Sequence, residues 1–170
     1  KQALKIHLVM LEQYPRPAQT EKKCAGIRAQ LNGGISMSAV KILVTTDGSN
    51  LTDKAVDTAI GLAEQVGGSV VGMTAVLTPA PAGGFEDEDP VVKERLEAIS
   101  RKAAEAEVPC EVIAEHAETV AQGVLACAAR CNATYIVMAS RGLGTFGALL
   151  LGSETQKVLS QADRPVVIVR

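Results

Sequence analysis

Residues 40–77 read VKILVTTDGSNLTDKAVDTAIGLAEQVGGSVVGMTAVL, and they contain the clearest signals of the fold class. It opens with a run of apolar and β-branched residues, 40–46, that ends at Asp47, which is typical of a buried strand followed by a turn. It closes with a second apolar run, 69–77, which predicts a second buried strand. A helical pattern lies between the two runs, so we expect a parallel pair of strands joined by a crossover helix.

The helical pattern extends from Thr52 to Val66. Thr52 is a plausible N-cap, and Gly67 and Gly68 would end the helix. Apolar residues recur at the three- and four-residue spacing of a helix face, namely Ala55, Val56, Ala59, Ile60 and Ala63.

The same alternation continues to the end of the chain, after a loop of proline, glycine and acidic residues at 78–90. Helices are predicted at 91–107, 119–131 and about 154–161. A third strand is predicted to start at 109–113, and two further strands lie at 134–139 and 166–169. We therefore expect an α/β protein: a doubly wound, five-stranded parallel sheet with helices on both faces. Ligands of such sheets bind at the carboxyl ends of the strands, where the strand order reverses.

The composition agrees with this fold class and divides the chain into two parts. Hydrophobic residues make up 47% of the 170 residues and aromatic residues only 2%, which suits valine-rich parallel strands under alanine-rich helices. Residues 1–36 hold six basic and two acidic side chains, whereas residues 37–170 hold eleven and seventeen. We expect 1–36 to be an N-terminal extension and 37–170 to be the folded domain. A net charge of −2 argues against a general nucleic-acid binder.

No membrane or secretory segment is predicted. The uncharged stretch 65–85 contains five glycines and two prolines and would not hold a spanning helix. The start of the chain lacks the pattern of a signal peptide. No CxxC pair occurs among Cys24, Cys110, Cys127 and Cys131, so we expect free thiols in a reducing cytoplasm.

A glycine-rich stretch, 139–154, follows the penultimate predicted strand. The Walker phosphate-binding pattern fails there, because no lysine precedes a serine or threonine. The dinucleotide pattern GxGxxG matches Gly142, Gly144 and Gly147, but it should follow the first strand of a βαβ unit, so we interpret this match as coincidental.

The end of this stretch, Gly152-Ser153, lies just before the last predicted helix. Backbone N–H groups of a glycine loop and of a helix N-terminus lack internal partners and can converge on a phosphate. Ser153 and Gln156 also have the spacing of a capping box, which any helix can carry. A phosphate site and a plain helix cap therefore remain open.

Residues 37–170 resemble the universal stress protein family. The resemblance rests on Asp47 after the first strand, on Gly142 followed by nine residues and then Gly152-Ser153, and on the final run from Arg164-Pro165 to Val169. The family pattern has a glycine where this chain has Ala139. If φ at this position were positive, the alanine would be strained by roughly 1 kcal/mol or more.

The resemblance implies a Rossmann-like fold of the adenine nucleotide alpha hydrolase type, and a site for ATP, alone or with Mg²⁺. Asp47 would accept hydrogen bonds from the ribose or the adenine edge, unless it only forms a turn. Thr45 and Thr46 would contact the base through backbone atoms. Ala75 and Met138 would line an apolar adenine slot, although core packing explains them equally well.

At the phosphates, Arg141 would neutralise charge, Ser153 would donate its hydroxyl, and Glu154 and Thr155 would offer backbone N–H groups. The full set of expected nucleotide-binding residues is Thr45, Thr46, Asp47, Ala75, Met138, Ala139, Arg141, Gly142, Gly152, Ser153, Glu154 and Thr155. We expect neither a catalytic group nor a protein-bound metal: the acidic run 86–89 reads as a solvated loop.

The resemblance further implies a cytoplasmic ATP-binding regulator or sensor of the stress response. Slow ATP hydrolysis at most is expected, since the sequence offers no evident general base. A homodimer would form through the last strand, Val166–Val169, with neither nucleic acid nor membrane as a partner.

Two alternatives remain open. Ala139 favours a dimerising interaction module that binds no nucleotide. An adenylating enzyme of related architecture is the second alternative, but its Ser-Gly-Gly-x-Asp-Ser loop is missing, because Asp47-Gly-Ser-Asn50 stands after the first strand.

Overall fold

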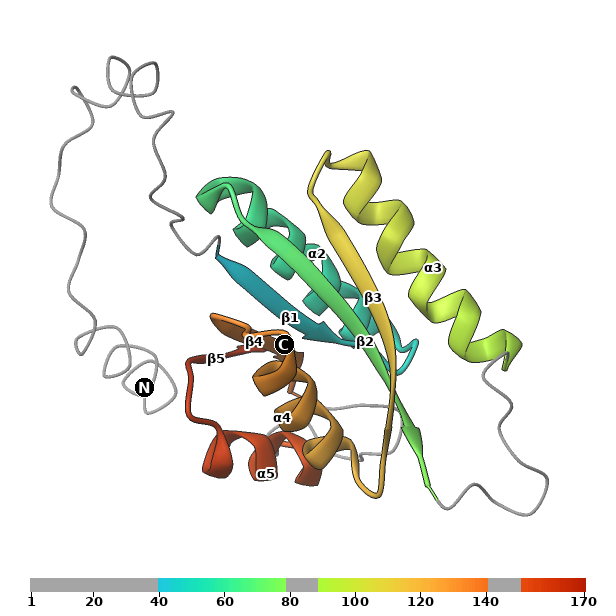
Figure 1. The fold of residues 1–170 in the computed structure, drawn as a ribbon, viewed down its shortest axis with the longest axis vertical. Helices are drawn as coiled ribbons and strands as arrows, with labels where there is room; N and C mark the ends of the chain where they lie inside the picture. Colours follow the sequence, from blue (N-terminus) through green and yellow to red (C-terminus); the bar gives the residue numbers. More distant parts are fainter. Residues whose placement is uncertain (1–39, 79–88, 141–150) are drawn as a thin grey trace, which may run out of the picture. The chain divides into compact units, whose positions relative to one another are not determined.

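A five-stranded parallel sheet forms the centre of the domain, with the strand order β3-β2-β1-β4-β5 (Figure 1). The computed structural model describes residues 40–78, 89–140 and 151–170. The strands are β1 (Lys41–Thr45), β2 (Ser69–Leu77), β3 (Cys110–Ala117), β4 (Tyr135–Ala139) and β5 (Val166–Val169). The predicted doubly wound α/β class is confirmed.

Helices cover both faces of the sheet (Figure 1). They are α2 (Asn50–Val66), α3 (Pro90–Glu105), α4 (Val120–Arg130) and α5 (Ser153–Gln161). Apolar residues of α2 and α3 pack with Ile42, Val44 and Val70 in one buried cluster. Those of α4 and α5 pack with Leu43 and Val71 in a second cluster. Adjacent residues of one strand point to opposite faces, which explains how β1 supplies both clusters.

The strand order reverses at β1. This strand pairs with β2 on one side, where Leu43 lies opposite Val71, and with β4 on the other, where Leu43 lies opposite Ile136. The chain leaves β1 for α2 and leaves β4 for the segment that leads to α5. The carboxyl ends of β1 and β4 therefore adjoin at the switch point, where ligands of doubly wound sheets bind.

The predicted caps are partly wrong. Helix α2 begins at Asn50, and its N-cap is Ser49, whose side chain accepts the N–H of Thr52. Thr52 is instead a buried residue of the first turn. The predicted end of this helix is confirmed, because Gly67 adopts the left-handed conformation at φ 63°.

The start of α5 also differs from the capping-box expectation. Gly152 is the N-cap and makes no side-chain cap hydrogen bond, so Ser153 is the first helical residue rather than a cap. Gln156 donates its side-chain amide to the carbonyl of Leu151 at 2.8 Å. The capping box is therefore wrong, while the helix begins within one residue of the predicted start.

Two further expectations concern the chain as a whole. The predicted domain boundary at Met37 lies outside the described residues and stays a prediction. Within the described ranges, no helix has the length and apolar character needed to cross a membrane.

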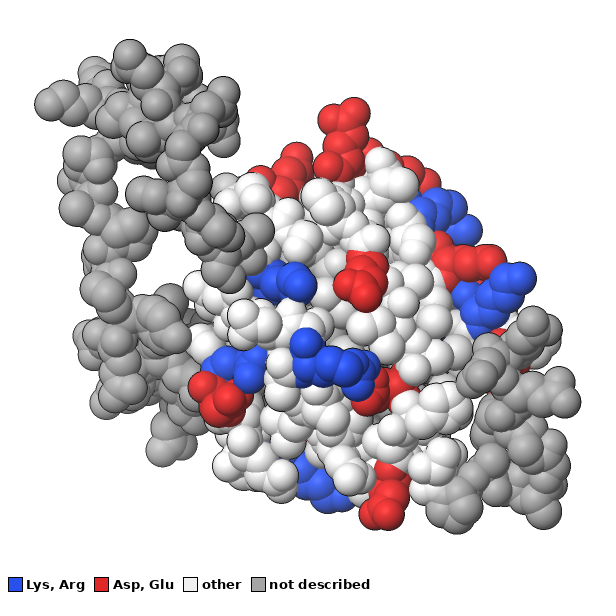
Figure 2. Space-filling model, viewed as in Figure 1, with Lys and Arg blue, Asp and Glu red and all other residues white. Residues whose placement is uncertain are grey.

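Basic and acidic side chains are interspersed on the face of the domain shown in Figure 2.

Candidate functional site

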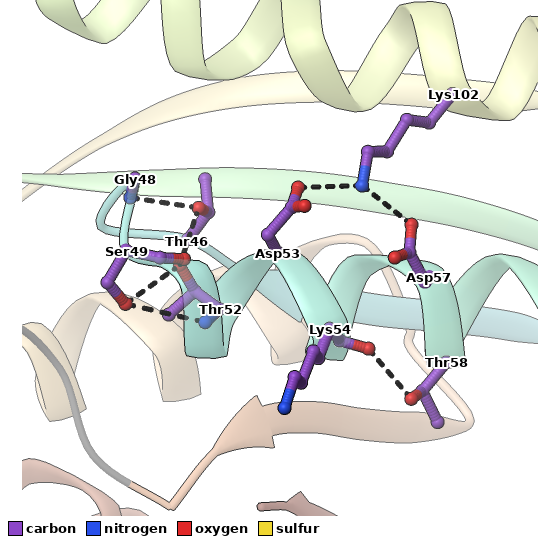
Figure 3. A network of polar contacts seen from close by, with 9 residues as sticks. All are labelled: Thr46, Gly48, Ser49, Thr52, Asp53, Lys54, Asp57, Thr58 and Lys102. Atoms are coloured by element: carbon purple, nitrogen blue, oxygen red, sulfur yellow. Dashed lines mark hydrogen bonds and ion pairs between the residues drawn. The ribbon is translucent and has the colours of Figure 1, made fainter.

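The turn after β1 is fixed by hydrogen bonds to β2 and to itself. The N–H of Thr46 donates to the carbonyl of Met73 at 2.9 Å, and the hydroxyl of Thr74 donates to the carbonyl of Thr46 at 3.3 Å. The N–H of Gly48 donates to Oγ1 of Thr46 at 3.0 Å (Figure 3). Gly48 has φ 81°, a conformation that glycine adopts without strain. This turn sets the direction in which α2 starts.

Asp47 lies within this turn and contacts the first residues of α2. Its Oδ1 accepts the backbone N–H of Ser49 at 3.0 Å, which closes an Asx turn. The hydroxyl of Thr52 lies 3.0 Å from the same oxygen. The turn-forming role of Asp47 is thus visible in the structure. Its contact with a ribose or an adenine stays a prediction.

The start of α5 is fastened to the end of β4. The N–H of Gly152 donates to the carbonyl of Ser140 at 2.8 Å, and the hydroxyl of Thr155 donates to the carbonyl of Ala139 at 3.1 Å. Ser140 itself donates its N–H to the carbonyl of Val169 on β5, also at 2.8 Å. The chain therefore returns to the carboxyl end of β4 before α5 begins.

This anchoring determines which groups of α5 can face a ligand. The first backbone N–H groups of an α-helix have no partner inside the helix, and in α5 these belong to Ser153, Glu154 and Thr155. Ser153 is exposed, so its hydroxyl is accessible. The side chain of Thr155 is 4% exposed and occupied by its bond to β4, so only its backbone could serve a ligand.

Ala139 does not adopt the positive φ that would strain an alanine. Among the described residues, Glu107 and Asn132 are the non-glycine residues with positive φ, so Ala139 carries no left-handed strain. It is 5% exposed and packs in the cluster that contains Val44 and Val137. The alanine is thus compatible with the backbone of β4.

The residues expected to form an adenine slot pack in the core. Met138 is 4% exposed and belongs to the cluster under α4 and α5, and Ala75 packs partly buried against the same cluster. Thr45, at 8% exposure, is also buried. Arg141 and Gly142 lie outside the described residues. A nucleotide contact of any of these residues stays a prediction.

A cavity of about 370 Å³ opens between the turn after β1 and the helices α2 and α3. Thr46 and Asp47 line it, as does Val56 on α2. From α3 it receives Arg95 and Lys102, which sequence reasoning did not single out. The depth of this cavity depends on how α2 and α3 are spaced, which no sequence pattern specifies.

Lys102 joins α3 to α2 beside this cavity. Its ammonium group lies 2.7 Å from a carboxylate oxygen of Asp53 and 2.7 Å from one of Asp57 (Figure 3). Burial lowers the pKa of Lys102, but the hydrogen bonds to the two carboxylates more than offset this, so its pKa is raised. The spacing of Asp53 and Asp57, four residues apart on one helix face, is the signal that could have indicated a cationic partner.

The structure also bears on metal binding and on the cysteines. Among the described residues, no three histidine, cysteine or carboxylate side chains gather as a metal site would require. Cys110, Cys127 and Cys131 are free thiols. Burial raises the pKa of Cys127 to about 12, which keeps this thiol protonated and unreactive.

The geometry places this chain in the class of doubly wound α/β proteins whose switch point lies between two adjoining strand ends. One of these ends carries a turn closed by a hydrogen bond to Asp47, and the other holds the N-terminus of a helix. The sequence model of the Universal stress protein family matches residues 40–170. The chain therefore belongs to the universal stress protein family, as its sequence motifs predict.

Curated relatives agree with this assignment. Over 146 residues the chain is 35% identical to the universal stress protein YxiE of Bacillus subtilis (strain 168), an alignment that covers 76% of this chain and 98% of the relative. It is 34% identical over 133 residues to a universal stress protein of Thermus aquaticus, with 76% and 97% coverage.

Solved structures show the same fold. A universal stress protein of Archaeoglobus fulgidus superimposes with a TM-score of 0.65 at 19% identity, over 77% of this chain and 93% of its own. The complex of an A. fulgidus universal stress protein with dAMP gives a TM-score of 0.63 at 20% identity, with 79% and 100% coverage. A universal stress protein in complex with cAMP gives 0.62 at 24% identity, with 78% and 97% coverage.

Proposed function

We propose that this universal stress protein binds an adenine nucleotide, ATP in particular, at the switch point between β1 and β4. The observation that carries the proposal is the hydrogen bond from Gly152 to Ser140, which brings the N-terminus of α5 back to the end of β4. A helix N-terminus held at this position favours an anion through its N–H groups and its dipole. Two structural neighbours are complexes with the adenine nucleotides dAMP and cAMP, which supports the same ligand class.

In this proposal the nucleotide lies across the two strand ends. Asp47 accepts hydrogen bonds from the ribose hydroxyls, while Thr45, Thr46, Ala75 and Met138 surround the base. The N–H groups at the start of α5, the hydroxyl of Ser153 and the charge of Arg141 bind the phosphates. The remaining contacts come from Gly142 and Gly152 and from the backbone at Ala139, Glu154 and Thr155.

We further propose a regulatory role in the cytoplasm rather than a catalytic one. The carboxylates of Asp47 and Glu154 each accept a backbone N–H group. Because both side chains serve as hydrogen-bond acceptors for the backbone, neither is placed as a general base for water, which supports slow ATP hydrolysis at most. Such a protein would report nucleotide or stress status to a partner instead of turning substrate over.

A homodimer through β5 belongs to the same proposal. β5 is an edge strand of the sheet, and all four of its residues are only partly buried. Val167 packs against the α2 side and Ile168 against the α4 side, so both faces of the strand already contact the core. An apolar edge strand of this kind is open to pairing with a second copy. Sedimentation velocity tests this, and a monomer at micromolar concentration would contradict it.

Isothermal titration calorimetry with the full chain tests nucleotide binding, with and without Mg²⁺. Asp47→Asn keeps an oxygen acceptor for the turn but removes the charge, and Gly152→Val adds bulk at the start of α5. We expect each change to weaken ATP binding by on the order of tenfold, about 1.4 kcal/mol. Asp57→Asn is the matched control, since it also removes one negative charge, here from α2, at a residue that pairs with Lys102 and has no part in the proposed site.

The outcomes separate the proposal from its alternatives. Equal affinities for wild type, Asp47→Asn and Asp57→Asn would argue against the proposed ribose contact. Absence of heat at millimolar ATP would favour an interaction module that binds no nucleotide. Rapid ATP turnover coupled to an acceptor would favour an adenylating enzyme.

A further inference from the structure

The side chain of Glu154 leaves its own helix and binds the start of another. Glu154 lies in the first turn of α5, and its Oε2 accepts the backbone N–H of Ala121 at 2.8 Å. Ala121 is the second residue of α4. The other carboxylate oxygen, Oε1, pairs with Lys157 one turn further along α5, at 2.6 Å. One carboxylate therefore connects the N-terminal ends of two helices.

Helix α4 thus has two caps at its N-terminus. Thr119, the N-cap residue, accepts the N–H of Gln122 through its own side chain at 3.2 Å. The N–H of Ala121 is satisfied from α5 by Glu154. Ala121 is 3% exposed, so without Glu154 this donor would be buried with little access to water. Loss of such a partner costs more than the hydrogen bond itself contributes.

An apolar contact continues this connection along the two helices. Val124 on α4 and Val158 on α5 are both fully buried in the same cluster. Their packing holds the helices side by side, but apolar contacts are not directional. The hydrogen bond that Ala121 donates to Glu154 is directional, so it fixes where the first turn of α5 lies relative to α4.

The surroundings also determine what the carboxylate charge does. A negative side chain in the first turn of α5 would repel an anion at that helix end if it faced the same way. Here one oxygen of the carboxylate faces the N-terminus of α4, whose dipole stabilises the negative charge. The other oxygen pairs with the ammonium of Lys157. These two interactions, the ion pair with Lys157 first, hold the pKa of Glu154 below its usual range.

We propose that Glu154 is a positioning residue of the nucleotide site: its side chain holds the anion-binding end of α5 in place by fastening it to α4, and does not itself touch the nucleotide. The inference rests on the proposed function, since it assigns α5 to the phosphates. It predicts that loss of the fastening weakens phosphate binding specifically, and that a neutral acceptor at the same position restores it.

Three variants of the full chain test this. Glu154→Ala removes the acceptor, whereas Glu154→Gln keeps an oxygen that can accept the N–H of Ala121. Glu97→Ala removes an exposed carboxylate from α3, and so controls for the change in net charge. Calorimetry with ATP and with adenosine separates phosphate contacts from base and ribose contacts. Amide hydrogen exchange at Ala121 reports the hydrogen bond directly.

We expect Glu154→Ala to weaken ATP binding about three- to tenfold, the loss of roughly one hydrogen bond, with little change for adenosine. Exchange at Ala121 should accelerate in this variant, and Glu154→Gln should restore most of both readouts. Equal losses for ATP and adenosine, or no rescue by glutamine, would overturn the inference. If the wild-type chain binds neither ATP nor adenosine, the proposed function is wrong. Unchanged amide exchange at Ala121 in Glu154→Ala would separately show that Glu154 does not fasten α5 to α4, and would overturn the inference whether or not nucleotide binds.

Discussion

The guanidinium of Arg130 makes two hydrogen bonds to the carboxylate of Glu115 and so joins the last turn of α4 to β3. Glu115 is 7% exposed, and a buried carboxylate that loses its cation is strongly destabilising. We therefore expect Arg130→Ala to lower the melting temperature, and Arg130→Lys to have a smaller effect, because lysine cannot form the two parallel bonds. Thermal unfolding followed by circular dichroism measures both.

The control for this prediction removes the carboxylate as well. The double variant Glu115→Ala with Arg130→Ala leaves no buried charge, so it should be more stable than Arg130→Ala alone. A double variant that unfolds at a lower temperature than Arg130→Ala would show that the stabilisation does not depend on the charge pair.

Gly72 allows α3 to pack closely on β2. A Cβ at this position would lie 2.7 Å from Cγ2 of Ile99, closer than carbon atoms approach without displacement. We expect Gly72→Ala to destabilise the domain by about 1–3 kcal/mol through overpacking. In an Ile99→Ala background the same change should cost less, since the clashing atoms are absent. Urea unfolding of the wild type, the two single variants and the double variant measures the coupling. Strictly additive losses of unfolding free energy would contradict this explanation.

Ala139 departs from the family pattern, yet its backbone carries no positive φ. We expect Ala139→Gly to destabilise the domain by about 0.5–1 kcal/mol, because glycine in a strand has more conformational freedom to lose. We expect no gain in ATP affinity, because the methyl group packs with Val44 and Val137 in the core. A large gain in calorimetry would show that the alanine restricts the ligand.

The lowered pKa of Glu154 predicts a pH dependence. A carboxyl group whose pKa is lower in the folded than in the unfolded state stabilises the fold above the unfolded value, about 4.3, and this stability is lost as the pH falls through the folded value. Wild type should therefore melt a few degrees above Glu154→Gln at pH 6, with a smaller difference at pH 2.5. A difference independent of pH would indicate that the charge contributes nothing.

Much of the fold could be predicted from the sequence, because its signals are local. The bounds of β2 and β5 agree with prediction: Gly68 precedes one strand and Pro165 the other, and both are strong breakers. The start of α2 could not be predicted as well. Ser49 and Thr52 are both good caps, and Thr52 is drawn inward by contacts of 3.1 Å with Thr46 and 3.0 Å with Asp47.

The candidate site divides in the same way. The position of Asp47 after β1 and of Gly152 before α5 follows from motif spacing, and the structure places both at the carboxyl ends of adjoining strands. The bond between Glu154 and Ala121 joins residues 33 positions apart in two helices. Such a contact depends on how the helices pack, so the sequence contains no periodic signal for it.

The central position of β1 has a consequence for how the protein folds. Among the described elements this strand is synthesised first, and β2 and β3 can pair beside it before β4 exists. Its other edge must wait for β4: the hydrogen bond from Lys41 to Thr134 spans 93 residues of chain. An incomplete chain thus exposes an apolar strand edge, which favours misassembly, and closure of so distant a pair slows folding. Chaperone dependence should therefore be greatest for nascent chains that end before β4.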